Sequence, residues 1–343
     1  MRQMKVARIH APGDVRISEE PIPAVGDGDS LVRVEAVGLC GSDLHWFHSG
    51  GIGDAKLDQP LILGHEFAGV VEGGELDGRV VAVDPARPCY ECRECDEGHR
   101  NLCTHVKFAG HGRNDGGLRQ YVSWPTSLLY PLPETLDSVD GALLEPLGVA
   151  IHAWDLAKVR LAAQVAIVGC GPIGLLLIRL ARAAGATSVV AIEPRPHRRE
   201  AAWAAGASRV LDPTDADYED AITRDENGSI DVVIEASNHP DGAQLAVDLV
   251  KVGGLVVLAG IPDDDKTTFQ AATARRKGLT IKTSRRMGEV YDRAIRLVEN
   301  GLVEIASLAT HRFGFDEIDQ AFTQAQDRVG LKVIIEPWRD VSS

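Results

Sequence analysis

VAIVGCGPIG, residues 165–174, is the stretch of sequence that decides the fold. Four apolar residues typical of a buried strand run directly into the pattern G-x-G-x-x-G, and a helical stretch follows. In such a strand–turn–helix, the glycines permit a tight turn and close approach of a pyrophosphate, while the helix N-terminus offers it free N–H groups. The stretch therefore predicts a dinucleotide-binding loop. The expected contacts with the cofactor are Gly169, Gly171, Pro172, Ile173 and Gly174.

An acidic residue, Glu193, ends the next expected strand about 20 residues after the glycines, where the ribose hydroxyls would lie. This placement argues against the alternative, a glycine turn that binds no nucleotide. The carboxylate would repel a 2′-phosphate, so NAD is favoured over NADP. Arg195, Arg198 and Arg199 follow closely and weaken this preference, because arginine accommodates that phosphate. We expect Arg198 to contact the cofactor, and at least two of the three arginines to form a solvated helix start.

Apolar strands alternate with helices on the C-terminal side of the glycine loop. Further strands are expected at 188–192, 231–235 and 255–259, each built on a run of three or more apolar residues, with helical segments between them. Continuous apolar strands between helices indicate a parallel sheet that is covered on both faces. Residues 155–284 therefore form the expected dinucleotide-binding domain.

The flanking segments have a different character. The N-terminal part contains short β-type runs, such as 31–37, punctuated by glycine and proline. After the α/β region, two amphipathic helices precede a last strand at 332–335. We predict a β-rich domain over residues 1–154 that is interrupted by the α/β domain and completed by residues 285–343.

Length, charge and the first residues limit the class of protein. A chain of 343 residues suggests two domains, and 44% hydrophobic with 25% charged residues is the balance of a soluble globular protein. The net charge of −14 argues against binding to nucleic acid or to an anionic membrane surface. No apolar run reaches the roughly 18 residues of a membrane span, and the chain starts without a signal-peptide stretch. A cytoplasmic protein is expected.

Four of the six cysteines fall within fifteen residues, in the pattern C-x2-C-x2-C-x7-C inside the segment 85–110. Disulfides are rare in a reducing cytosol, and such clustering indicates metal binding. Four thiolates surround a zinc ion at about 2.3 Å and leave no open position, which is typical of a structural site. Disulfides or an iron–sulfur cluster are the alternatives. The expected ligands of this structural zinc are Cys89, Cys92, Cys95 and Cys103.

A second group of residues of metal-binding types is spread over three separate segments of the sequence. Cys40 lies in GLCGSDLH, His65 and Glu66 lie in GHEFAG, and Glu145 lies in LEPLG. One thiolate, one imidazole and a carboxylate make a three-ligand zinc site whose fourth position is open to water or substrate. Spacing alone does not establish such a site, because single cysteines and histidines are more often packed than ligating.

Together these motifs resemble the zinc-containing medium-chain dehydrogenases and, within them, the sorbitol/xylitol/L-idonate dehydrogenase branch. The similarity covers nearly the whole chain, and the motifs follow one another in the order and at the intervals of the family. The matching motifs are CGSDLH at 40–45, GHE at 64–66, the four-cysteine segment, DGG at 115–117, EPL at 145–147 and the glycine loop at 169–174.

The resemblance implies an α/β fold in which a GroES-like, β-rich catalytic domain is split around a Rossmann dinucleotide-binding domain, with the active site in the cleft between them. It also implies that Cys40, His65 and Glu66 bind the catalytic zinc. Alcohol dehydrogenases proper carry a cysteine in the region of Glu145, so the glutamate points to polyols. Glu145 would bind the zinc directly or hold the zinc-bound water, and the sequence does not choose between the two.

Positions near the first expected ligand match further roles in the family. Ser42 and His45 correspond to a proton relay through the cofactor ribose, although a turn hydroxyl and a helix-surface histidine are the plainer interpretations. Asp43 is expected to orient a ligand, since a metal-bound histidine usually needs an acceptor on its other nitrogen. Trp46 and Arg286 are the expected substrate contacts. For Trp46 the alternative is plain core packing, and for Arg286 the neighbouring Arg285 leaves the register with the family open.

The activity that the resemblance implies is transfer of a hydride from a secondary alcohol of a polyol or sugar-like substrate to NAD+, giving the ketone. A relative acting on L-threonine, an aldose or a cyclitol is the alternative within the family. A different class, a non-catalytic dinucleotide-binding protein, would lack a zinc ligand or a relay residue, whereas this chain has them all. The family also suggests a homodimer or homotetramer.

Overall fold

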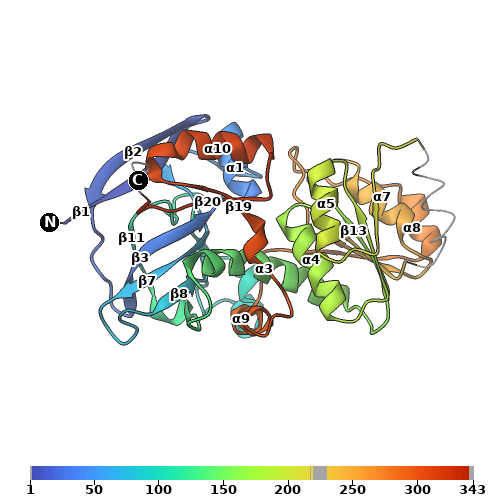
Figure 1. Ribbon diagram of the computed structural model, residues 1–343, viewed down its shortest axis with the longest axis horizontal. Helices are drawn as coiled ribbons and strands as arrows, with labels where there is room; N and C mark the ends of the chain where they lie inside the picture. Colours follow the sequence, from blue (N-terminus) through green and yellow to red (C-terminus); the bar gives the residue numbers. More distant parts are fainter. Residues whose placement is uncertain (1, 217, 219–229, 340–343) are drawn as a thin grey trace. The chain divides into compact units, whose positions relative to one another are not determined.

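The computed structural model describes residues 2–216, 218 and 230–339, and the chain forms two compact units (Figure 1). The split unit comprises Met1–Pro146, Tyr291–Gly301 and Ile305–Ser343, and the inserted unit comprises Leu147–Val290 and Leu302–Glu304. The expected α/β fold, a β-rich domain split around a dinucleotide-binding type of domain, is confirmed.

The inserted unit is built on one parallel sheet of six strands. They are β13 (Gln164–Val168), β14 (Ser188–Ile192), β15 (Arg209–Leu211), β16 (Val232–Glu235), β17 (Leu255–Leu258) and β18 (Thr280–Thr283). Their order across the sheet is β15-β14-β13-β16-β17-β18, so the winding reverses between β13 and β16. In open parallel sheets, ligands bind beyond the carboxyl ends of the strands at such a switch point.

Helices connect these strands, and the described ones are α4 (Pro172–Ala183), α5 (Pro196–Ala204), α7 (Gly242–Leu249) and α8 (Ala271–Lys277). Proline stands at the first position of α4 and of α5, where its missing N–H would have no helical partner in any case. The side chain of Lys277 donates hydrogen bonds to the carbonyls of Val247, Asp248 and Val250 at the end of α7. These bonds satisfy carbonyl groups that a helix end leaves without partners.

The split unit contains a seven-stranded sheet. Its strands are β3 (Asp29–Gly38), β7 (Glu66–Glu72), β8 (Val80–Val83), β11 (Tyr121–Pro125), β12 (Leu129–Pro131), β19 (Ala309–Phe313) and β20 (Lys332–Ile335). The last strand, β20, pairs with β3 through Ile334 opposite Gly38 and Ile335 opposite Val37. The C-terminal segment thereby completes a sheet that the N-terminal residues begin.

Smaller elements surround this sheet. A second sheet has the order β2-β1-β6, and two two-stranded sheets pair β4 with β5 and β9 with β10. The bounds are β1 (Gln3–Ala11), β2 (Asp14–Pro21), β4 (Gly51–Ile52), β5 (Ala55–Lys56), β6 (Leu61–Ile62), β9 (Ala86–Arg87), β10 (Lys107–Phe108), α1 (Gly41–Ser49), α2 (Arg93–Asp96), α3 (Ser138–Ala157), α9 (Tyr291–Glu299) and α10 (Ile318–Asp327). Among the described residues, no helix is both long and apolar enough to cross a bilayer.

Gly174, in the first turn of α4, faces the carbonyl oxygen of Gly169 so closely that a methyl group at position 174 would overlap it. We expect Gly174→Ala to lower the free energy of unfolding by about 1–3 kcal/mol, the usual cost of overpacking. Denaturant unfolding followed by far-UV circular dichroism measures this loss.

The matched control is Gly288→Ala in the same unit, because nothing lies within 4 Å of the position that its added carbon would take. Equal free energies of unfolding for the two variants would contradict the expected overlap at Gly174.

Candidate metal and cofactor sites

Cys40, His65 and Glu66 lie together in the split unit. A thiol sulfur, a ring nitrogen and a carboxylate oxygen from these residues all lie within 4.8 Å of one another. Cys40 immediately precedes α1, while His65 and Glu66 lie where the chain enters β7. Because β3 and β7 pair through Gly38 and Glu66, the sheet brings the segment before α1 next to the start of β7. We call Cys40, His65 and Glu66 the donor group. Their ligand types and their short mutual distances fit a zinc ion.

Asp43 connects the two segments that carry these donors. Its fully buried carboxylate accepts hydrogen bonds from the backbone N–H of Cys40, at 2.9 Å, and of Gly64, at 3.1 Å. The same carboxylate lies 3.5 Å from Nδ1 of His65. Burial opposes its ionisation, but His65 and the two N–H groups outweigh burial and lower the pKa of Asp43. Asp43 therefore orients the His65 ring as an ionised acceptor.

The Glu66 carboxylate is paired with a lysine that the sequence analysis missed. Nζ of Lys332, the first residue of β20, lies 2.7 Å from each carboxylate oxygen of Glu66 and 3.3 Å from the carbonyl oxygen of Leu39. Burial lowers the pKa of Lys332, but the charges of Glu66 and Cys40 outweigh this effect and raise it. The only signal in the sequence is a lysine that begins an otherwise apolar strand, Lys332–Ile335.

Glu145 lies on α3 and is buried in the split unit. Burial raises the pKa of its carboxyl group to about 8, with Glu66 adding to the rise and His65 and Lys332 opposing it. The carboxylate therefore lies within electrostatic reach of the donor group. It is not among the three residues whose ligand atoms lie within 4.8 Å of one another in the described structure.

The other expected residues on α1 occupy different environments. Oγ of Ser42 lies 3.4 Å from Nε2 of His65, so the hydroxyl is at the donor group. His45 is half-buried on the same helix. Trp46 is 1% exposed, belongs to the core of the split unit and meets His111 edge-on. The relay role of His45 and the substrate contact of Trp46 stay predictions.

The four clustered cysteines are brought together around α2. One sulfur from each of Cys89, Cys92, Cys95 and Cys103 lies within 4.8 Å of the others. The Sγ atoms of Cys92 and Cys95 are 3.5 Å apart, as are those of Cys89 and Cys103. Tetrahedral thiolates at zinc bond lengths would lie about 3.8 Å apart. None of the described cysteines forms a disulfide, and the geometry fits a closed zinc site.

The glycine loop has the backbone that a bound pyrophosphate requires. Gly169 has φ 87°, a left-handed conformation that glycine adopts without strain. A carbon added to Gly169 would lie 2.8–2.9 Å from atoms of Ser237, so the loop has no room for a larger residue. In the described structure no side chain caps the N-terminus of α4, which leaves its first N–H groups available to an anion. The loop therefore fits a dinucleotide.

Glu193 directs its carboxylate toward this loop. One oxygen accepts from the N–H of Cys170 at 2.8 Å, and the other accepts from the N–H of Arg195 at 3.0 Å. Each oxygen keeps lone-pair capacity for a ribose hydroxyl. Nη1 of Arg198 comes 3.7 Å from where a side-chain carbon on Gly171 would stand, so its guanidinium borders the loop. Both residues border the glycine loop, and their contacts with a cofactor stay predictions.

Arg199 and Arg286 have different structural settings. Arg199 pairs with Asp212 at 2.6 Å. It also donates hydrogen bonds to the carbonyls of Glu193 and Pro194, so its role in the described structure is to stabilise the inserted unit. Arg286 follows β18 and has φ 54°, a left-handed conformation that costs roughly 1 kcal/mol or more outside glycine. Its expected contact with substrate stays a prediction.

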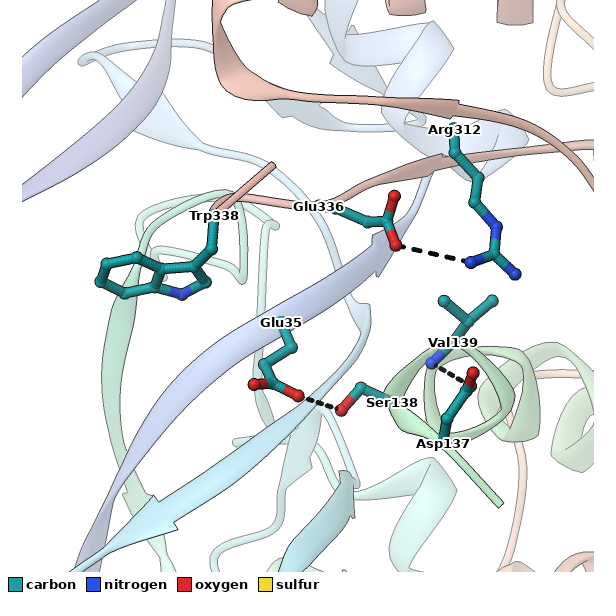
Figure 2. Close-up of a pocket in the computed structure, with 7 residues that line it drawn as sticks. All are labelled: Glu35, Asp137, Ser138, Val139, Arg312, Glu336 and Trp338. Atoms are coloured by element: carbon teal, nitrogen blue, oxygen red, sulfur yellow. Dashed lines mark hydrogen bonds and ion pairs between the residues drawn. The ribbon is translucent and has the colours of Figure 1, made fainter. Parts of the chain in front are cut away.

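A surface hollow of about 270 Å³ lies elsewhere in the split unit. Figure 2 draws the residues that line it. Its lining residues are Glu35, Asp137, Ser138, Val139, Arg312, Glu336 and Trp338. Ser138 donates to Glu35, the N–H of Val139 donates to Asp137, and Arg312 pairs with Glu336 (Figure 2). These polar groups satisfy one another, and no lining residue belongs to either of the two candidate metal clusters, so the hollow is separate from both.

Comparison with known proteins connects both units to one family. Residues 26–134 match the model of the alcohol dehydrogenase GroES-like domain, and residues 172–300 match that of the zinc-binding dehydrogenases. Sorbitol dehydrogenase of Bacillus subtilis is 31% identical over 347 residues, which cover 98% of each chain.

Solved structures agree with this family. L-idonate 5-dehydrogenase of Escherichia coli has a TM-score of 0.91 and 28% identity, with 98% of each chain covered. A zinc-binding dehydrogenase of Sinorhizobium meliloti bound to NADP has a TM-score of 0.89 and 32% identity, covering 98% of this chain and 100% of that one. The GroES-like and Rossmann domains implied by the sequence are thereby confirmed. The chain belongs to the zinc-dependent medium-chain dehydrogenases, in the branch of the polyol dehydrogenases.

Proposed function

We propose that this protein oxidises a secondary hydroxyl of a polyol or sugar-like substrate to the ketone, with NAD+ as the hydride acceptor and zinc at the reacting hydroxyl. The observation that carries the proposal is the compact donor group of Cys40, His65 and Glu66 in the split unit. Buried Glu145 supports a polyol, because alcohol dehydrogenases proper carry a cysteine in that region.

The ligand roles follow from the contacts of each donor. Asp43 lies at Nδ1 of His65, so Nε2 is the atom that remains to bind the metal. Lys332 faces both oxygens of Glu66, and one oxygen can ligate while the other keeps its bond to the lysine. A zinc ion held by Cys40, His65 and Glu66 would lower the pKa of a bound hydroxyl and leave one position open to it.

Glu145 and Ser42 have the supporting roles. Since Glu145 stands outside the compact donor group, we assign it to the water or hydroxyl in the open position rather than to direct ligation. Ser42, whose hydroxyl lies 3.4 Å from Nε2 of His65, is placed to accept the proton of the substrate hydroxyl. His45, one turn along α1, is assigned to the next step of that relay.

The four cysteines are assigned to a structural zinc. Cys89, Cys92, Cys95 and Cys103 offer four thiolates and leave no open position, so this site stabilises its loop and takes no part in the reaction.

We assign NAD rather than NADP as the cofactor. Glu193 is buried at the end of β14 and directs its carboxylate toward the glycine loop, and a 2′-phosphate at this place would meet its negative charge. Arg198 at the border of the loop favours the opposite choice, and the dehydrogenase of Sinorhizobium meliloti is bound to NADP. The hydrogen bond of the Glu193 carboxylate to the N–H of Cys170 supports the assignment to NAD.

The free cysteines bear on the cellular compartment of the enzyme. All described cysteines are unpaired, which suits a reducing compartment such as the cytoplasm.

Strand β18 lies at an edge of the parallel sheet, where free N–H and C=O groups can pair with another chain. We propose a homodimer or a homotetramer.

The direct test is NADH or NADPH formation by the zinc-loaded protein on a panel of polyols, aldoses, cyclitols and L-threonine. We expect preferred turnover of a polyol, with kcat/KM for NAD at least about tenfold above that for NADP. Glu193→Ala should reduce this cofactor preference. Turnover of L-threonine or aldoses alone would contradict the assignment to polyols, and equal use of both cofactors would contradict the role of Glu193.

Removing the charge of Lys332 tests its pairing with Glu66. We expect Lys332→Met to lower the free energy of unfolding by about 3–5 kcal/mol in EDTA, because it leaves a buried carboxylate without a cation. Added zinc should restore part of this loss, since the bound ion supplies positive charge beside Glu66. Denaturant unfolding with EDTA and with zinc measures both values.

The control for this change is Lys107→Met, at an exposed lysine of the same unit. An Lys332→Met protein as stable as this control in EDTA would show that the buried pair does not hold Glu66.

A further inference from the structure

Strand β16 ends in a buried carboxylate, Glu235, that no role above uses. The side chain is 5% exposed. Val168 of β13 lies opposite Glu235 on one side, and Leu258 of β17 lies opposite it on the other. Since the glycine loop begins directly after Val168, Glu235 stands at the switch point of the sheet, level with the start of that loop.

The carboxylate of Glu235 ties together the two loops that follow β16 and β17. One oxygen accepts from the backbone N–H of Ser237 at 2.7 Å and from its hydroxyl at 2.6 Å. The other oxygen accepts from the N–H of Gly260 at 3.2 Å. The backbone carbonyl of Glu235 also accepts from the N–H groups of Ala259 and Gly260, at 2.8 and 3.1 Å, so the side chain adds to a backbone connection between the two loops.

No cation balances this carboxylate among the residues that the structure describes. Burial raises the pKa of Glu235, and the hydrogen bonds from Ser237 and Gly260 oppose that rise. A buried acidic group without a charged partner costs desolvation energy that an apolar residue at the end of the strand would avoid. The hydrogen bonds of the carboxylate to Ser237 and Gly260 offset part of this cost and connect the two loops.

Three glycines enclose the pair formed by Glu235 and Ser237. A carbon added to Gly169 would lie 2.8 Å from Cβ of Ser237. A carbon on Gly242 would lie 2.6 Å from its hydroxyl oxygen, and one on Gly260 would lie 2.6 Å from Oε2 of Glu235. Interiors this tightly packed transmit displacements rather than absorb them. A shift of Ser237 would therefore reach the backbone of Gly169 in the dinucleotide loop.

We propose that Glu235 is a positioning residue for the dinucleotide: it holds Ser237 against Gly169 and thereby fixes the loop that receives the pyrophosphate. This role rests on the proposed function, because it requires the glycine loop to bind the cofactor. Glu235 itself does not touch the reacting atoms, so the effect is on cofactor affinity and not on the chemical step.

Glu235→Gln tests this role. The amide is nearly the same size, but its NH2 group must face either Ser237 or Gly260, both of which donate. We expect the dissociation constant for NADH, measured by fluorescence titration in the absence of substrate, to rise about tenfold or more. The KM for NAD should rise similarly, while kcat at saturating cofactor stays within about twofold.

Two further variants make the result decisive. Glu200→Gln changes an exposed glutamate on α5 of the same unit and should leave NADH affinity unchanged. Ser237→Ala removes one of the three hydrogen-bond donors to Glu235, so it should weaken NADH binding, but less than Glu235→Gln does. If Glu235→Gln does not fold, Ser237→Ala tests the positioning role by itself.

The outcomes separate the two proposals. Wild-type protein that binds neither NADH nor NADPH would overturn the proposed function. Wild-type protein that binds NADH, together with folded Glu235→Gln or Ser237→Ala protein that binds it equally well, would overturn the positioning role alone.

Discussion

The Asp43 carboxylate is the constraint on which the proposed catalytic site depends. It holds the segment of Cys40 and the segment of Gly64 by their backbone N–H groups, and it faces the ring of His65. One buried side chain thus fixes the position of two donors and the orientation of one. Ligands that are held in place before the metal binds need no costly rearrangement when it does.

The distribution of charge around these donors is consistent with a bound cation. The carboxylates of Glu66 and Glu145 are both buried, and together with Cys40 they raise the pKa of Lys332. Burial raises the pKa of Glu145 to about 8, and His65 and Lys332 oppose this rise. A divalent ion among the three donors would add positive charge beside these carboxylates.

Features formed by residues that lie close together in the sequence were predictable from the sequence. The glycine loop and the four-cysteine segment are local patterns, and Cys40, His65 and Glu66 could be assigned through the order of the family motifs. The pairing of Glu66 with Lys332 joins residues 266 positions apart, so no spacing rule links them. The contacts of Glu235 depend in the same way on the order of strands β13, β16 and β17, which only the folded sheet defines. The structure likewise places Trp46 in a core, which its aromatic character alone could not distinguish from a pocket wall.

The most direct test of the central claim is the zinc content of the purified protein, measured by mass spectrometry of the metal together with turnover. The two donor groups predict two zinc ions per chain in the wild-type protein. The Cys40→Ser protein should keep the zinc of the four-cysteine group, lose most of the other, and have no measurable turnover while still binding NADH. A Cys40→Ser protein with both zinc ions and near-wild-type turnover would contradict the assignment of Cys40, His65 and Glu66 as the catalytic zinc site.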